Sequence, residues 1–309
     1  MSVLTETFTL SNGDQIPKIG FGTWLLNEGD ECYDAVADAL RLGYRHIDTA
    51  RAYHNEASVG RAVRDSGIPR KEIYVTSKLP AEAKAYDKAL EEFETTMGEI
   101  GLDYLDLYLI HAPWPWDEVG KDCRKENQQI WKAMEEFLAS GRVKAIGVSN
   151  FGPEDLDSLL PACETKPMVN QIRWFIGLDP FDTVQKCAEH DMVVEAYSPF
   201  AHGLIVNHPE IGDIAGRYGV SAPQLCIRYL LQQGAVVLPK ATKTPHIQQN
   251  AQLDFEISAA DMGLLDAMHD TEKHEDAVKF RWSSPNRRLV PALSGRTGLG
   301  GARVDAGTR

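Results

Sequence analysis

The 309-residue sequence contains no apolar run approaching the ~20 residues that a membrane span requires. Its first six residues lack the basic and apolar regions of a signal peptide. Five cysteines lie far apart, and no pair has the spacing of a zinc site or a redox motif. We therefore expect a cytoplasmic protein whose cysteines are reduced thiols, with neither a membrane partner nor a bound metal.

Basic residues are also scarce relative to acidic ones. The chain has 32 Lys and Arg against 45 Asp and Glu, which gives a net charge of −13. This acidity argues against nucleic acid as a partner, although it leaves room for a local basic pocket. A Gly-x-Gly-x-x-Gly motif is missing after the first strand, so a Rossmann domain is disfavoured.

Short apolar runs alternate with helical patterns along most of the chain. Asn12-Gly13 predicts a β-hairpin that joins residues 8–10 and 15–17. About eight β-then-α units follow, and this is the count of a TIM barrel, a (β/α)8 α/β fold. We predict one barrel domain over residues 1–294 and a mobile Gly-rich C-terminal tail over residues 295–309.

Three of the predicted strands close on ionisable residues. Asp48, Lys78 and His111 stand at the ends of consecutive strands, spaced 30 and 33 residues apart, which is one βα unit each time. Tyr53 lies on the loop just past Asp48. Because the carboxyl ends of barrel strands meet at one face, we expect these four side chains to converge.

Such a set suits proton donation to an oxygen that gains negative charge. A phenol has a pKa of about 10, and a neighbouring ammonium is expected to lower it. A carboxylate beside the lysine would keep the lysine charged, and a histidine can hold the substrate oxygen. With no obvious nucleophile in the set, carbonyl reduction fits better than hydrolysis.

Two other interpretations stay open at this point. His46, Asp48 and His111 could be ligands of a metal-dependent barrel hydrolase, although no His-x-His pair is present and Lys78 would not suit a zinc site. The chain could also be a cofactor-binding regulatory barrel with little turnover, because a fold does not guarantee an activity.

Over about residues 6–270 the sequence resembles the aldo-keto reductase family, in particular its 2,5-diketogluconate reductase-like members. The stretches that carry the resemblance are GFGTW at 20–24, GYRHIDTA at 43–50, LDLYLIH at 105–111, AIGVSNF at 145–151, MVNQ at 168–171 and LPK at 238–240. The resemblance implies a TIM barrel with the catalytic tetrad Asp48, Tyr53, Lys78 and His111, in which Tyr53 donates the proton.

The resemblance also implies a nicotinamide cofactor, normally NADPH, bound without a Rossmann fold. Ser149, Asn150 and Gln171 match the residues that hold its carboxamide, and Tyr197 matches the aromatic ring that stacks on the nicotinamide. Further positions along the cofactor are Thr23, Trp24, Asp48, Ser198, Pro199, Leu204, Lys240, Ala241, Thr242, His246 and Asn250.

The segment after the last strand departs from the family. Lys240 and Asn250 match, but the family's serine is Ala241 and the arginine that grips the 2′-phosphate of NADPH is His246. Arginine is always charged and binds phosphate through two hydrogen bonds, whereas a histidine with an ordinary pKa is mostly neutral at pH 7. We therefore expect that NADPH still works, with Lys243 and Thr242 as partial substitutes, and that NADH is also accepted.

The substrate pocket departs as well. Ala112-Pro113 replaces the usual Trp-Pro after the catalytic histidine, and Arg173 stands where the family usually has a glutamate. We expect the substrate pocket to be formed by Trp24, Tyr53, His111 and Trp114. Trp24, Trp114 and Trp282 could be its apolar walls, and packing between barrel and loop is an equally open role for these tryptophans. A keto sugar and an aliphatic or aromatic aldehyde are both candidate substrates, and a monomer is expected from the family's habit.

Overall fold

A computed structural model describes residues 2–269 of the chain. Its centre is a sheet of eight parallel strands in sequential order from β3 to β10. The strands are β3 (Phe21–Gly22), β4 (His46–Asp48), β5 (Tyr74–Leu79), β6 (Leu105–Ile110), β7 (Val143–Ser149), β8 (Val169–Arg173), β9 (Val193–Tyr197) and β10 (Val236–Leu238). The predicted tail and Trp282 lie outside the described residues.

The sheet closes on itself through the segment just before β3. Ile19 forms a parallel bridge with Val237. The Gly20 N–H donates to the Val237 carbonyl at 2.9 Å, and the Gly22 N–H donates to the Pro239 carbonyl at 3.0 Å. A Cβ on Gly20 would lie 2.6 Å from the Leu238 side chain and 2.9 Å from the buried His46 ring, so a larger residue there would force these side chains to shift.

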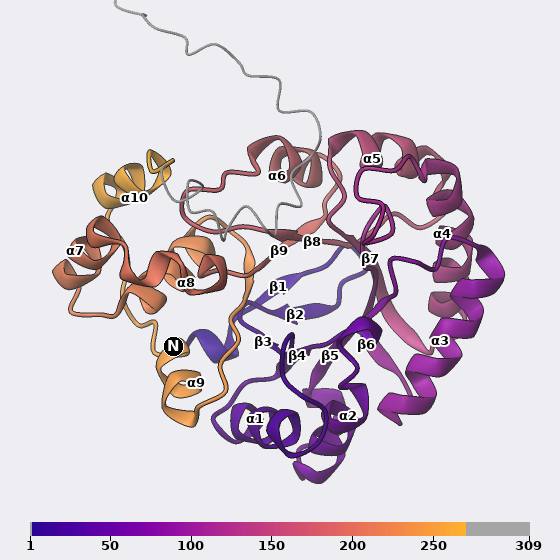
Figure 1. The fold of residues 1–309 in the computed structure, drawn as a ribbon, viewed down its shortest axis with the longest axis horizontal. Coiled ribbons are helices and arrows are strands. Elements are labelled where there is room, and N and C mark those ends of the chain that lie inside the picture. The colour runs from indigo at the N-terminus through magenta and orange to yellow at the C-terminus, as the bar shows by residue number, and fades with distance from the viewer. Residues whose placement is uncertain (1, 270–309) are drawn as a thin grey trace, which may run out of the picture.

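Helices surround the strands, as Figure 1 shows. They are α1 (Asp30–Arg41), α2 (Glu56–Asp65), α3 (Tyr86–Ile100), α4 (Arg124–Ala139), α5 (Pro153–Leu159), α6 (Phe181–Ala188), α7 (Pro209–Arg217), α8 (Ala222–Gln232), α9 (Thr244–Asn250) and α10 (Ala259–Asp266). Parallel strands that are buried on both faces need such a cover, which explains why their sequences are almost continuously apolar. The predicted (β/α)8 barrel is confirmed.

The hairpin of β1 (Thr7–Thr9) and β2 (Gln15–Pro17) is also where it was predicted. Leu10 and Ile16 of this segment pack with buried residues of the barrel interior, among them Leu107 and Val236. The Asn12 side chain donates to the Lys144 carbonyl at 3.0 Å, at the start of β7. The hairpin therefore covers the amino-terminal end of the barrel and leaves the carboxyl end for the site.

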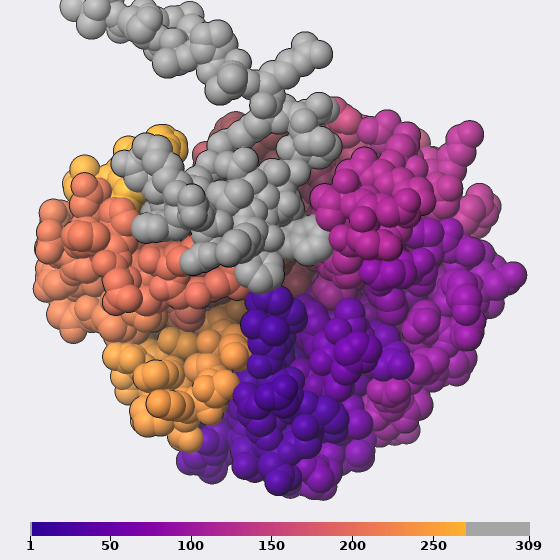
Figure 2. Space-filling view, in the orientation of Figure 1, coloured from indigo at the N-terminus to yellow at the C-terminus, as the bar shows by residue number. Residues whose placement is uncertain are grey.

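The last helices return to the beginning of the chain. In Figure 2, α9 lies against the indigo N-terminal segment. The Tyr44 hydroxyl donates to the Ile247 carbonyl at 3.0 Å, and Thr244 donates to Asp38 of α1. This contact holds the segment after β10, where the cofactor residues were expected, beside α1. Across residues 2–269, no helix is long and apolar enough to cross a membrane.

Candidate active site

Asp48 and Lys78 meet at the carboxyl end of the barrel. The Lys78 Nζ donates to both Asp48 carboxylate oxygens at 2.8 Å and to the Thr49 carbonyl at 2.8 Å. Both side chains are buried, so each charge is stabilised by the other and by hydrogen bonds rather than by water. Strand pairing brings them together, because β4 and β5 are neighbours in the sheet.

Tyr53 is held beside this pair by a short 3-10 helix, Arg51–Tyr53, that follows β4. Its hydroxyl lies 3.3 Å from the Lys78 Nζ. Asn55 fixes the loop, because its buried amide donates to the Thr23 and Leu26 carbonyls and accepts from the Thr49 hydroxyl. Sequence reasoning missed Asn55, whose partners are spread over two loops.

One expectation about Tyr53 was wrong in direction. Burial raises the pKa of the Tyr53 phenol well above its ordinary value, and the negative charge of Asp48 raises it further. The Lys78 ammonium, which lies 3.3 Å from the phenol oxygen and pairs with Asp48, does not reverse this effect. The phenol is therefore fully protonated at neutral pH and can donate only to a strong base, such as a developing alkoxide.

His111 directly follows β6 and faces Tyr53 with ring centroids 5.5 Å apart. Burial and the positive charges of Lys78 and Lys84 hold the pKa of His111 well below its usual range. The imidazole is therefore neutral and can donate one hydrogen bond to a substrate oxygen without becoming charged.

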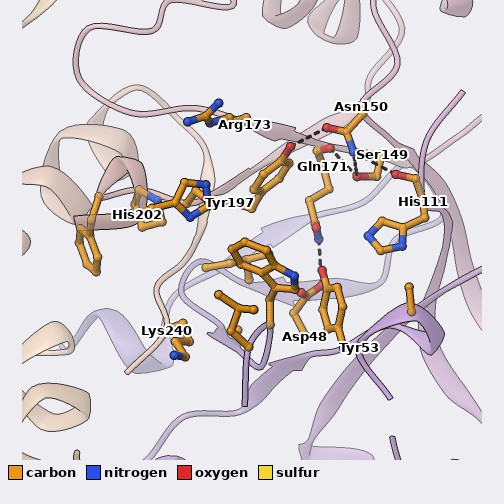
Figure 3. Close-up of a pocket in the computed structure, with 18 of the residues that line it drawn as sticks. Asp48, Tyr53, His111, Ser149, Asn150, Gln171, Arg173, Tyr197, His202 and Lys240 are labelled. Carbon is orange, nitrogen blue, oxygen red and sulfur yellow. Dashed lines mark hydrogen bonds between the residues drawn. The ribbon is translucent and has the colours of Figure 1, made fainter. Parts of the chain in front are cut away.

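Amide and hydroxyl groups continue the site along β7, β8 and β9. The Asn150 Nδ2 donates to the His111 carbonyl at 2.9 Å and to the Ser149 hydroxyl at 3.0 Å. The Tyr197 hydroxyl donates to the Asn150 Oδ1 at 2.7 Å. The backbone of Asn150 has a φ of 63°, a left-handed conformation that asparagine tolerates better than most residues. These bonds hold the Tyr197 ring across the barrel mouth, as Figure 3 shows.

A cavity of about 610 Å³ opens over these groups. Many of the predicted site residues line this cavity, namely Trp24, Asp48, Tyr53, His111, Ser149, Asn150, Gln171, Tyr197, Ser198, Pro199 and Lys240. A volume of this size and a lining of aromatic rings with a few convergent polar groups are typical of a small-molecule site.

Comparison with known proteins agrees with this geometry. A family model described as the aldo/keto reductase family matches residues 18–270. The chain belongs to the aldo/keto reductase family. It is therefore a nicotinamide-dependent oxidoreductase of a family that acts on small carbonyl compounds.

Individual aldo/keto reductases and their relatives match nearly the whole barrel. YtbE, an uncharacterised oxidoreductase of Bacillus subtilis (strain 168), is 40% identical over 267 residues, which cover 85% of this chain and 92% of YtbE. The glyoxal reductase of the same organism is 38% identical over 271 residues, with 87% and 95% covered. A Bombyx mori aldo-keto reductase solved in complex with NADP superposes with a TM-score of 0.77 at 30% identity, with 84% and 92% covered.

The remaining predicted site residues lie behind or beyond the cavity wall. Lys78 is buried behind Asp48, and the buried Thr23 hydroxyl donates to the Asp48 carbonyl at 3.0 Å. Leu204 is half-buried in the loop after Tyr197. Of the predicted cofactor residues after β10, Ala241 and Asn250 are buried. Thr242 and His246 are exposed.

The tryptophan that lines the cavity is Trp116 rather than the expected Trp114. Trp114 is buried in a small cluster with Ala81 and Ala112. Trp116 packs on it with ring centroids 5.4 Å apart and meets the His111 ring at 5.0 Å. Trp114 therefore takes the packing role rather than the pocket role, because the loop turns its ring away from the cavity.

Arg173 and His202 also line the cavity and were not predicted there. Figure 3 places Arg173 next to Tyr197, its register partner on β9. The ring of His202 lies 5.2 Å from that of Trp24. Although the His202 side chain is exposed at the cavity, partial desolvation and the charge of Arg173 lower its pKa to about 4. The departure of Arg173 from the family pattern was the one signal in the sequence that could have pointed to its position at the cavity.

The alternative metal site of His46, Asp48 and His111 is not supported, because these side chains do not face one common cavity. His46 lies in the barrel core, bonded to the Thr76 hydroxyl at 3.0 Å, and does not line the cavity that His111 faces. Within residues 2–269, no cluster of three or more His, Cys, Asp or Glu side chains is placed to hold a metal ion.

Proposed function

We propose that this protein reduces an aldehyde or ketone to an alcohol with NADPH, and that Tyr53 supplies the proton. The observation that carries the proposal is the position of the Tyr53 hydroxyl. It faces the cavity, lies 3.3 Å from the Lys78 ammonium, and stands next to a neutral His111. These are the groups that a carbonyl oxygen needs as it gains negative charge.

His111, Tyr53 and Lys78 each have a separate role in the proposed reduction. His111 donates a hydrogen bond to the carbonyl oxygen and orients the carbonyl group toward Tyr53. When bound, the reduced nicotinamide supplies the hydride that adds to the carbonyl carbon. Tyr53 transfers its proton to the resulting alkoxide, which is a much stronger base than a phenolate. Lys78 then stabilises the Tyr53 phenolate until it is reprotonated.

The chain's own groups fit the cofactor. The Tyr197 ring offers a flat face at the cavity wall, and Ser149, Asn150 and Gln171 offer polar atoms for a carboxamide. Lys240 offers a positive charge farther along the same cavity. We propose NADPH as the main cofactor and NADH as a second one, because His246 is a weaker partner for a 2′-phosphate than arginine. The similarity to a glyoxal reductase supports a small aldehyde as substrate.

The test is the loss of reduced-cofactor absorbance with a panel of aldehydes and keto sugars, with NADPH and NADH in parallel. We expect turnover in the wild type and a decrease in kcat of about 10²- to 10⁴-fold in Tyr53→Phe, with cofactor binding retained. Cofactor binding without turnover on any substrate would instead favour a regulatory barrel.

We also propose a cytoplasmic monomer. All five cysteines are free thiols, which suits a reducing compartment. Gel filtration with light scattering would check the oligomeric state.

A further inference from the structure

Glu195 is a fully buried carboxyl group that no step above uses. It lies on β9, directly opposite Gln171 on β8 in the sheet register. Its side chain points into the barrel beneath the cavity, where its Oε2 accepts a hydrogen bond of 2.9 Å from the Gln171 Nε2. Its Oε1 lies 3.7 Å from the His46 Nε2.

The same Gln171 nitrogen also donates to the Asp48 Oδ2 at 2.9 Å. An amide nitrogen carries two hydrogens, so the two carboxyl groups take both of them. The Oε1 of Gln171 is then the only polar side-chain atom left to meet a ligand. Gln171 lines the cavity, whereas Glu195 does not. Gln171 can therefore only accept a hydrogen bond from a molecule in the cavity.

We propose that Glu195 is a positioning residue for the cofactor: together with Asp48 it locks the amide of Gln171 so that its Oε1 accepts an N–H of the nicotinamide carboxamide. This inference rests on the proposed function, because it assumes a nicotinamide beside Gln171. Glu195 would not touch the cofactor itself. Through its hydrogen bond to Gln171, it would determine that the Gln171 Oε1, and not the Nε2, faces the cofactor.

The charges around Glu195 suit this role. Burial, reinforced by the negative charge of Asp48, raises the pKa of Glu195 to about 8, so the carboxyl is mostly neutral at pH 7. His46 is neutral too, since burial and the charge of Lys78 lower its pKa to about 3. Glu195 can thus hold Gln171 without adding a second negative charge beside Asp48 and Lys78.

The experiment compares two cofactors in binding, so that it does not depend on turnover. Reduced 3-acetylpyridine adenine dinucleotide phosphate replaces the carboxamide of NADPH by an acetyl group, which has no N–H to donate. We expect the wild type to bind NADPH more tightly than this analogue. In Glu195→Leu, which removes one of the two acceptors of the Gln171 Nε2 and leaves Asp48 as the other, the preference should fall by ~3- to 10-fold, the equivalent of one neutral hydrogen bond.

Three further variants make the result specific. Glu195→Gln keeps an acceptor oxygen and should restore the preference to within about threefold of the wild type. Gln171→Leu should lose the preference by itself, and adding Glu195→Leu should then change nothing more, because the two residues act in series. Thr76→Val removes a buried hydroxyl bond to His46 at a similar depth and should leave the preference intact.

The outcomes separate the two proposals. A Glu195→Leu protein that keeps the full preference for NADPH over the analogue would overturn the role of Glu195, as would additive effects of Glu195→Leu and Gln171→Leu. Neither result bears on the proposed function, which fails instead if Tyr53→Phe retains wild-type turnover.

Discussion

The Nζ of Lys78 lies 2.8 Å from each carboxylate oxygen of Asp48, and both side chains are buried at the carboxyl end of the barrel. Removing Lys78 takes away the cation beside Tyr53 and leaves a buried carboxylate without its partner. We expect Lys78→Met to lower kcat by about 10²- to 10⁴-fold. The same change should lower the free energy of unfolding by ~3–5 kcal/mol.

The double variant Lys78→Met/Asp48→Asn distinguishes the two effects. It removes both charges, so urea unfolding should show that much of the lost stability returns, while kcat stays low. Recovery of kcat together with stability would mean that Lys78 acts only through the fold.

Trp116 and Trp114 offer a matched pair in the pocket wall. Trp116 lines the cavity and meets His111, whereas Trp114 is buried behind it. We expect Trp116→Ala to raise the KM for an aromatic aldehyde by about 10-fold with little change in the free energy of unfolding, because the ring lines the cavity proposed to hold the substrate. Trp114→Ala should instead cost ~3–5 kcal/mol of stability. Steady-state kinetics and urea unfolding of both variants check this, and equal effects on KM would contradict the assignment.

The sequence predicted the residues whose positions follow from the barrel alone. Asp48, Lys78 and His111 lie at or next to the ends of neighbouring strands, and the parallel sheet brings strand ends together whatever the loops do. Tyr53 is only five residues past Asp48, so the short connecting loop keeps its side chain near the end of the same strand. The spacing of strand ends was therefore sufficient to predict that these four side chains converge.

Residues that depend on loop paths and on depth within the barrel were not predictable in this way. Asn55 bonds to groups near residues 23, 26 and 49, and no local pattern marks that convergence. The choice between Trp114 and Trp116 depends on how one proline-rich loop turns. Glu195 sits in an apolar strand, where its role becomes visible only once Gln171 and Asp48 are placed beside it. The pKa of Tyr53 needed the burial of the ring, which spacing does not provide.

His246 tests the cofactor preference. It lies exposed on α9, after the strand that ends near Lys240. We expect His246→Arg to raise the preference for NADPH over NADH, measured as the ratio of kcat/KM values, by about 10- to 100-fold, because a hydrogen bond to a charged group contributes ~1.5–3 kcal/mol. The kcat with NADPH should hardly change.

His246→Gln is the control, since it keeps a polar side chain without a permanent charge and should leave the ratio within about threefold of the wild type. If the wild type already preferred NADPH by more than a thousandfold, the argument about His246 would be wrong.

The raised pKa of Glu195 predicts how stability changes with pH. In the unfolded chain a glutamate loses its proton near pH 4.5, whereas in the folded protein Glu195 keeps it up to about pH 8. Between these values the folded state binds the extra proton, so stability falls as pH rises, by at most ~1.4 kcal/mol per pH unit for one group. Above pH 8 this contribution is constant.

Glu195→Gln removes this titration and leaves the others in place, including that of Glu56, whose pKa burial raises to about 7. The free energy of unfolding of the wild type, minus that of Glu195→Gln, should therefore decrease from pH 5 to pH 8 and level off at pH 9. Urea unfolding at five pH values measures this difference. A difference that stays constant with pH would show that Glu195 is already ionised in the folded barrel, in which case Gln171 bridges two carboxylates and both of its N–H groups are held by negative charge.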